Sequence, residues 1–161
     1  MRAHSSREGG GVPGATRASG GVHHSEFVGR GHGPPAGVAR LRGARTTNLG
    51  LANAFGRADG ANVVTRDEVL ASCRAIAAPT DLPVNVDLEN CYADVPRAAA
   101  EMTLLTAATG IVGGSIEDAT GDAGKPIYDF GLTVERVRAA AEVAHGLAVP
   151  FFLTARAENY L

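Results

Sequence analysis

Acidic side chains and one arginine follow three apolar segments in the second half of the chain. The first segment ends with Asp87 and Glu89, the second is followed by Glu117 and Asp118, and the third ends with Arg156. Converging carboxylates suit a hard cation such as Mg²⁺, which takes one or two carboxylates and keeps several waters. The planar guanidinium of Arg156 suits a carboxylate or a phosphate. Together they could bind an anionic 2-oxo acid and stabilise an enolate. The alternative is an ordinary polar surface, because strands commonly end at the surface.

The apolar segments are predicted to be neighbouring strands of one parallel sheet, because helical patterns alternate with them. Strands are expected at residues 83–89, 111–116 and 150–155. Helices are expected from a capping box at Thr65 and Glu68, over residues 96–109 up to Gly110, and from a cap at Thr133 to Gly146. Ligands bind at the carboxyl ends of strands in parallel α/β folds. The pattern therefore predicts one rim that carries the acids and Arg156. Strand alternation would point Asp87 and Glu89 to the same face.

The two parts of the chain differ in composition. Residues 1–45 hold 11 of the 21 glycines, four of the five histidines and only two acids. They show no sustained apolar period and are predicted to be disordered. The net charge of the whole chain is −2, which gives no general attraction to nucleic acid or anionic lipid. No apolar run approaches the ~20 residues of a membrane helix, and no secretory signal is recognisable. We expect a cytoplasmic protein with neither nucleic-acid nor membrane partners.

Other residues that could do chemistry have simpler explanations. Cys73 and Cys91 do not make a disulfide scaffold. Cys91 could be a nucleophile, but small buried cysteines are commoner, and Cys73 is expected to pack. A zinc site is disfavoured because His145 is the sole histidine after residue 45. Tyr92 either contacts a substrate or covers a strand end. Lys125 either closes over an anion or is an ordinary solvated lysine.

Four segments resemble motifs of the isocitrate lyase/phosphoenolpyruvate mutase superfamily. Residues 83–92, PVNVDLENCY, are similar to its metal-binding strand, and residues 110–118, GIVGGSIED, to its G-x-x-G-x-x-I-E-D strand. Residues 152–158, FLTARAE, resemble its A-R-x-[DE] strand. Residues 46–50, TTNLG, and 56–60, GRADG, resemble the loop that cups the substrate carboxylate and the acidic position after it. The resemblance covers residues 44–161.

This resemblance implies a fold, a cofactor and a set of site residues. The superfamily has a (β/α)₈ barrel and binds Mg²⁺ with a 2-oxo acid or a phosphonate relative. We therefore expect an α/β fold that forms part of a TIM barrel, with parallel strands two to five and covering helices. The resemblance places metal ligands at Asp59, Asp87, Glu89 and Glu117, substrate contacts at Thr47, Asn48, Leu49 and Arg156, and catalytic roles at Arg156 and Glu117. Glu89 stands where many members have Asp, and Asn48 departs from the usual Ser or Gly.

The loop after Glu117 narrows the expected reaction. Isocitrate and methylisocitrate lyases carry a K-[KR]-C-G-H motif whose cysteine is an acid/base, whereas residues 119–127 read ATGDAGKPI. The phosphoenolpyruvate mutase loop pattern is absent as well. The chain therefore resembles the mutase-like branch. We expect Mg²⁺-dependent lyase or mutase chemistry on a small anionic 2-oxo acid or phosphoenolpyruvate-like substrate through an enolate, with C–C cleavage favoured. A homo-oligomer is compatible with this expectation.

The predicted organisation is an irregular segment at residues 1–44 and a partial TIM-barrel domain at residues 45–161. One set of codons for residues 26–36, read one base later, encodes SSWDVATARR, which resembles a family segment. Residues 1–44 are therefore hypothesised to be read in a shifted frame. Because the chain ends after the fifth expected strand, we expect an incomplete copy. The alternatives to an active enzyme are an inactive truncated remnant and a half-barrel that serves as a binding or assembly module.

Overall fold

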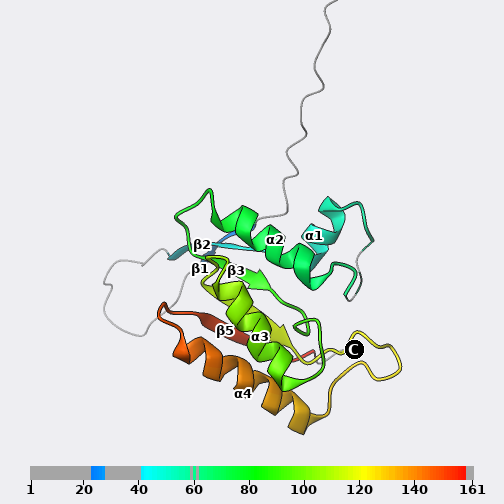
Figure 1. Cartoon of the computed structure of the whole chain (residues 1–161). Coiled ribbons are helices and arrows are strands. Elements are labelled where there is room, and N and C mark those ends of the chain that lie inside the picture. The colour runs from blue at the N-terminus through cyan, green and yellow to red at the C-terminus, as the bar shows by residue number, and fades with distance from the viewer. Residues whose placement is uncertain (1–22, 28–40, 59, 61, 159–161) are drawn as a thin grey trace, which may run out of the picture.

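Parallel strands and the helices that join them make up most of the described chain (Figure 1). A computed structural model describes residues 23–27, 41–58, 60 and 62–158. The strands are β1 (His23–Phe27), β2 (Leu41–Arg45), β3 (Val84–Asp87), β4 (Gly113–Glu117) and β5 (Phe152–Arg156). The helices are α1 (Asn48–Ala54), α2 (Arg66–Ala77), α3 (Pro96–Ala107) and α4 (Phe130–Gly146). Asp59 and most of the predicted irregular segment lie outside the described residues.

The sheet has the strand order β1-β2-β3-β4-β5. Strands β2 to β5 pair in parallel, and β1 pairs antiparallel with β2. Helix α3 packs against α2 and α4, and the three helices contact the strands beside them (Figure 1). The predicted parallel α/β fold is therefore confirmed. Among the described helices, none combines the length and apolar character that a membrane span requires.

Local sequence accounts for the best predicted element, helix α2. The Thr65 hydroxyl accepts the N–H of Glu68 at 3.4 Å, and the Glu68 carboxylate accepts the N–H of Thr65 at 2.9 Å. This capping box satisfies two N–H groups that lack helical partners. Val69, Leu70 and Cys73 are buried in the core on one face of the helix, as predicted.

Strand β4 lies deep in the molecule, and its two glycines allow its neighbours to approach. A Cβ at Gly113 would lie 2.9 Å from the carbonyl oxygen of Phe152 on β5, and one at Gly114 would lie 2.7 Å from Leu88. Leu88 is itself completely buried, next to Ile111 and Ile116 in the same core cluster. Larger residues at these glycines would therefore displace either β5 or the core.

The structure corrects two predictions near the beginning of the sheet. Strands β1 and β2 lie within the segment predicted to be disordered. The backbone N–H of Ala44 donates to Pro83 at 2.9 Å, and that of Thr46 donates to Asn85 at 3.0 Å. These bonds come from a distant segment, which composition does not reveal. In addition, α1 forms where only a substrate loop was expected.

Two element boundaries also differ from the prediction. Helix α4 begins at Phe130, and Thr133 donates its N–H to Asp129 within the first turn, so Thr133 is not the cap. Strand β3 ends at Asp87, and Glu89 has a φ of +47°. Strand alternation therefore does not set the direction of the Glu89 side chain.

Candidate active site at the strand ends

Arg156 lies beside carboxylates from three segments of the rim. In the sheet, Glu117 is paired with Arg156, and Asp87 is paired with Ser115. One guanidinium nitrogen of Arg156 is 3.3 Å from Glu117 and 3.6 Å from Asp87. The other terminal nitrogen donates to Glu158. The parallel sheet thus brings together Asp87, Glu117 and Arg156 of the residues predicted to meet at one rim, whereas the Asp118 carboxylate accepts the N–H of Glu158 at 2.8 Å.

Further hydrogen bonds orient the Asp87 carboxylate. Its Oδ1 accepts the hydroxyl of Ser115 at 3.2 Å and the N–H of Glu89 at 3.3 Å, while Oδ2 faces Arg156. The N–H of Asp87 donates to the Thr46 hydroxyl at 3.3 Å. Asp87 is therefore held by Ser115 of β4, by Thr46 directly after β2, and by Glu89 two positions along the chain.

A cleft of about 420 Å³ opens at this rim, within the size range of small-molecule sites. The charged or acidic side chains that line it are those of Glu89, Glu117, Asp122, Arg156 and Glu158, with Gly60 and residues of the 119–126 loop completing the wall. Four carboxylates and one guanidinium give the cleft a negative character that favours a cation. A narrower hollow beside it is bordered by Thr47, Asn48 and Asp87.

The Glu117 carboxylate has a pKa above its ordinary value. Burial is the largest of the effects that raise its pKa to about 7, and the carboxylates of Asp87, Glu158 and Glu89 add to it. The guanidinium of Arg156 acts in the opposite direction. Glu117 can therefore gain or lose a proton near neutral pH, a property common at catalytic sites.

The predicted substrate residues lie at the start of α1. Thr47 is the residue before the helix, and Asn48 and Leu49 form its first turn. N–H groups in a first turn have no partner within their own helix. Asn48 is buried and its side chain accepts the Tyr92 hydroxyl at 3.5 Å, whereas the Leu49 side chain is largely exposed. Tyr92 therefore connects the end of β3 with α1.

The segment that follows β3 has an uncommon backbone. Glu89, Cys91 and Tyr92 have φ values of +47°, +58° and +60°. Each such residue costs ~1–2 kcal/mol relative to a right-handed conformation. Hydrogen bonds hold the segment: Cys91 donates to Leu88 at 2.7 Å, and Tyr92 donates to the Asn90 side chain at 3.0 Å. Strain of this kind is typical of functional loops.

Cys91 is packed within this segment. It is buried, and burial raises its pKa to about 12. A thiol with such a pKa stays protonated, whereas the thiolate is the nucleophile. Cys73 is also buried, and burial raises its pKa to about 11. These observations support the interpretation that both cysteines are packing residues and not nucleophiles.

The loop after α1 reaches the same rim. The backbone N–H of Asn62 donates to the Glu89 carboxylate at 3.1 Å. Arg57 anchors the loop, donating to Val63 at 3.0 Å and to both oxygens of Glu68 at 2.8 and 2.7 Å. Asp59, predicted as a metal ligand, lies outside the described residues.

The rim carboxylates have the chemistry that Mg²⁺ requires. Within residues 23–27, 41–58, 60 and 62–158, no three His, Cys, Asp or Glu side chains converge closely enough to enclose a metal. Asp87 and Glu117 nevertheless approach the same guanidinium nitrogen. Two carboxylates beside solvent fit an ion that retains several waters. The four predicted metal ligands remain a prediction.

Sequence reasoning assigned no role to three residues that shape the rim. Glu158 binds Arg156 and stands at the acidic position of the A-R-x-[DE] pattern, so the motif itself could have identified it as a site residue. Asn90 and Arg136 organise the segment after β3 through hydrogen bonds. Arg136 begins a buried row on α4 that continues with Ala140 and Ala144. An arginine at helical spacing from alanines of the buried face is the sequence signal for this residue.

Comparisons with known proteins agree with this geometry. The family model described as phosphoenolpyruvate phosphomutase matches residues 36–161. A Burkholderia cenocepacia J2315 protein named as a lyase/mutase shares 46% identity over 72% of this chain and 41% of its own, with a TM-score of 0.68. A 2,3-dimethylmalate lyase, a member of the PEP mutase/isocitrate lyase superfamily, shares 25% identity over 71% of this chain and 40% of its own, with a TM-score of 0.64.

A phosphonopyruvate hydrolase in complex with oxalate and Mg²⁺ shows the same fold. It shares 20% identity over 71% of this chain and 39% of its own, with a TM-score of 0.64. No curated protein matches the chain. The chain spans about two fifths of the length of the solved structures it matches.

These likenesses confirm two expectations. The parallel strands β2 to β5 and their helices correspond to part of the TIM barrel of this superfamily. The motif resemblance is confirmed by a family model that covers most of the described residues. The chain belongs to the phosphoenolpyruvate phosphomutase family, within the PEP mutase/isocitrate lyase superfamily.

Proposed function

We propose that the protein is a Mg²⁺-dependent lyase that cleaves a C–C bond in a small 2-oxo acid through an enolate. The observation that carries this proposal is the contact of Arg156, which lines the cleft together with Glu117, with the carboxylates of both Glu117 and Asp87. A guanidinium for an anion thus lies next to carboxylates for a cation. The names of two similar proteins support Mg²⁺-dependent chemistry on small acids. One is a 2,3-dimethylmalate lyase, and the other is a phosphonopyruvate hydrolase in complex with oxalate and Mg²⁺.

Each proposed role follows from the chemistry of the group. Asp87 and Glu117, supplemented by Glu89 and Asp59, would hold Mg²⁺, which when bound supplies a positive charge beside the enolate oxygen. Arg156 would bind a substrate carboxylate through its planar fork. The first turn of α1, from Thr47 to Leu49, would offer backbone N–H groups to the same anion.

The pKa of Glu117 gives it a second proposed role. A carboxyl group with a pKa of about 7 exists in both forms at neutral pH. In the metal-free site its carboxylate can accept a proton and its acid form can return one near the operating pH of most enzymes. Bound Mg²⁺ would favour the carboxylate form and lower this pKa, so the proton-transfer role is proposed for Glu117 when it is not a metal ligand. Its contact with Arg156 supports this role, because Arg156 would bind the substrate anion.

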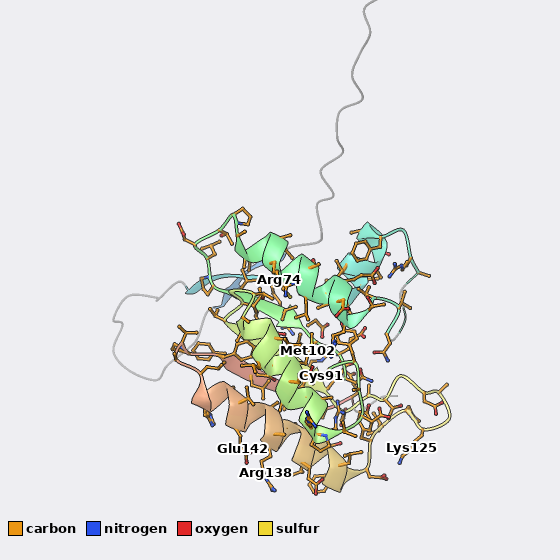
Figure 2. The ribbon with its side chains drawn as sticks, in the orientation of Figure 1. Arg74, Cys91, Met102, Lys125, Arg138 and Glu142 are labelled. Carbon is orange, nitrogen blue, oxygen red and sulfur yellow. The ribbon has the colours of Figure 1, made fainter. Side chains whose placement is uncertain are left out.

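The loop after β4 supports a reaction in which no cysteine of this loop acts as acid or base. Its sequence contains neither cysteine nor histidine, and its own hydrogen bonds close it, from the Thr120 hydroxyl to Lys125 at 2.6 Å and from Gly124 to Asp122 at 2.8 Å. Lys125 donates to Asp129 at 2.7 Å and lies at the outer end of the loop (Figure 2). Lys125 therefore behaves as a surface lysine in this conformation.

The test is turnover of a panel of small 2-oxo acids and their phosphonate relatives by the purified protein with Mg²⁺. We expect cleavage of at least one 2-oxo acid, loss of that activity with a chelator, and inhibition by oxalate. Replacing Arg156→Gln should lower kcat/KM about 100-fold or more, because a charged hydrogen-bond donor to the reacting anion is removed.

Arg138→Gln is the matched control, because Arg138 is an exposed arginine on the outer side of α4 (Figure 2). It should retain full activity. The proposal would be wrong if the protein neither turned over any member of the panel nor bound Mg²⁺ and oxalate. If the protein rearranged a phosphonate but cleaved no C–C bond, the proposed activity would be that of a mutase and not of a lyase.

A further inference from the structure

Arg136 is a charged side chain in the interior of the molecule. It lies in the second turn of α4 and is 1% exposed. Its guanidinium donates to the carbonyl oxygens of Asn90, Ala93 and Asp94, the last at 2.6 Å. A buried guanidinium needs such partners, because an uncompensated charge in the interior is strongly unfavourable. The segment after β3 therefore wraps its carbonyl groups around Arg136.

Tyr128 completes this arrangement from the other side. The Arg136 guanidinium lies 4.3 Å from the centroid of the Tyr128 ring, a cation–π contact. The Tyr128 hydroxyl donates to the Asp94 carboxylate at 2.5 Å and accepts the Asn90 side-chain amide at 3.3 Å. Arg136, Tyr128, Asn90 and Asp94 are called the Arg136 clamp below.

The clamped segment is the one that forms part of the candidate active site. Asn90 lies between Glu89 and Cys91, and three of residues 89–92 have positive φ values. Glu89 lines the cleft, and the Tyr92 hydroxyl reaches Asn48 at the start of α1. Any movement of the clamped carbonyls would therefore move a cleft carboxylate and a support of α1.

We infer that Arg136 is a positioning residue for the site. It fixes residues 89–92 in the conformation that presents Glu89 to the cleft, although its own hydrogen bonds go to backbone carbonyls. The part of this inference that concerns ligands rests on the proposed function. If Arg136 were merely a structural support, its loss would lower the stability of the whole protein without a separate effect on this segment.

Hydrogen exchange measured by mass spectrometry distinguishes these two roles. The variants are Arg136→Met, Arg136→Lys and Tyr128→Phe, and Arg138→Met is the matched control on the exposed side of α4. In both Arg136 variants we expect exchange of the amides of residues 89–94 to accelerate at least tenfold more than that of the α2 amides, which report the loss of global stability. Tyr128→Phe should give a smaller increase, and Arg138→Met none. Lysine keeps the charge but cannot reproduce the planar fork.

Ligand binding provides the second readout. Calorimetric titration with Mg²⁺ in the presence of oxalate should give at least a tenfold higher Kd for Arg136→Lys and an unchanged Kd for Arg138→Met. If wild-type protein binds neither probe, the proposed function fails, and exchange in residues 89–94 still decides whether the clamp fixes this segment. If Arg136→Met does not fold, Arg136→Lys and Tyr128→Phe supply the answer.

Two results would overturn the inference. One is an exchange rate in residues 89–94 that is unchanged, or that rises equally in α2. The other is faster exchange in residues 89–94 with an unchanged Kd for the two probes. The second result would leave Arg136 as a local structural support that has no influence on the site.

Discussion

Two arginines hold two loops of the candidate site, and they differ in what they bind. Arg136 is buried and donates to backbone carbonyls of the segment after β3. Arg57 anchors the loop after α1, has a side chain that is 38% exposed, and binds the Glu68 carboxylate with two hydrogen bonds. One loop is therefore fixed by the interior of the protein, and the other by an ion pair open to solvent.

Because one arginine binds backbone carbonyls and the other binds a carboxylate, the two loops should respond differently to pH and salt. Backbone carbonyls do not titrate, and salt screens a buried charge much less than an exposed one. The Glu68 carboxylate titrates, and its pKa is lowered to about 2 by the hydrogen bond from Arg57 and then by those from Thr65. The two loops meet where Asn62 donates to Glu89. At the cleft, a segment whose arginine binds carbonyl groups that do not titrate therefore meets a loop whose arginine binds a carboxylate that does.

The largest expected effect is the loss of stability in Arg136→Met. Methionine fills part of the space but leaves three carbonyl oxygens, one buried and two partly buried, without their donor, and each unsatisfied buried group costs ~1–3 kcal/mol. We expect the free energy of unfolding to fall by about 3–5 kcal/mol, measured by urea denaturation. Arg138→Met should change it by less than ~0.5 kcal/mol. A loss below ~1 kcal/mol in Arg136→Met would show that water replaces the guanidinium.

Tyr128→Phe should have an intermediate effect. The ring and its contact with Arg136 remain, but the Asp94 carboxylate and the Asn90 amide lose the hydroxyl between them. The free energy of unfolding should fall by about 1–2 kcal/mol in the same denaturation experiment. If the loss matched that of Arg136→Met, the hydroxyl rather than the guanidinium would be the centre of the clamp.

The parts of the fold predicted correctly are those written in local sequence. The capping box at Thr65 and the buried face of α2 follow from residues three and four positions apart. The alternation of helices and apolar strands indicated a parallel sheet, and the parallel sheet placed Asp87, Glu117 and Arg156 at one rim. That convergence needed no knowledge of side-chain contacts.

The parts that were missed depend on distant partners. The family resemblance implied a second parallel strand, but no local pattern located β2, which pairs with β3 through the N–H groups that Pro83 and Asn85 accept. The strand expected to continue to Glu89 ends at Asp87. Glu89 has a φ of +47°, and the carbonyl of Asn90 binds Arg136, 49 positions after Asp87. Periodicity describes a strand but does not show where a tertiary contact ends it.

Glu68→Gln should have a smaller effect, which depends on pH. In the folded protein the Glu68 pKa is about 2, compared with an ordinary value of 4.5, so the unfolded chain binds a proton more readily between these values. The stability that Glu68 contributes is present above about pH 4.5 and is lost as pH falls toward 2. Urea denaturation between pH 6 and pH 3 should therefore show a flatter decline in the variant than in the wild type.

Parallel declines in the two proteins would contradict this assignment. Arg57→Gln is the complementary variant, because it removes the partner that lowers the Glu68 pKa most. It should flatten the same part of the curve. Added salt should weaken this pair but leave the difference between wild type and Arg136→Met almost unchanged, because screening acts mainly on exposed charges.

The smallest effect is expected at a third arginine, which extends the comparison to the open surface. Arg66 and Glu101 join α2 to α3 through a 3.3 Å ion pair, and about half of each side chain is exposed. Exposed pairs of this kind contribute ~0–1 kcal/mol, so Glu101→Gln should lower the free energy of unfolding by less than ~0.5 kcal/mol at neutral pH. Burial and partner type would then order the three arginines, from Arg136 through Arg57 to Arg66. This order would be wrong if Glu101→Gln and Glu68→Gln lowered the free energy of unfolding equally. The Glu68 carboxylate accepts hydrogen bonds from both Arg57 and Thr65, so it should contribute more than the Glu101 carboxylate.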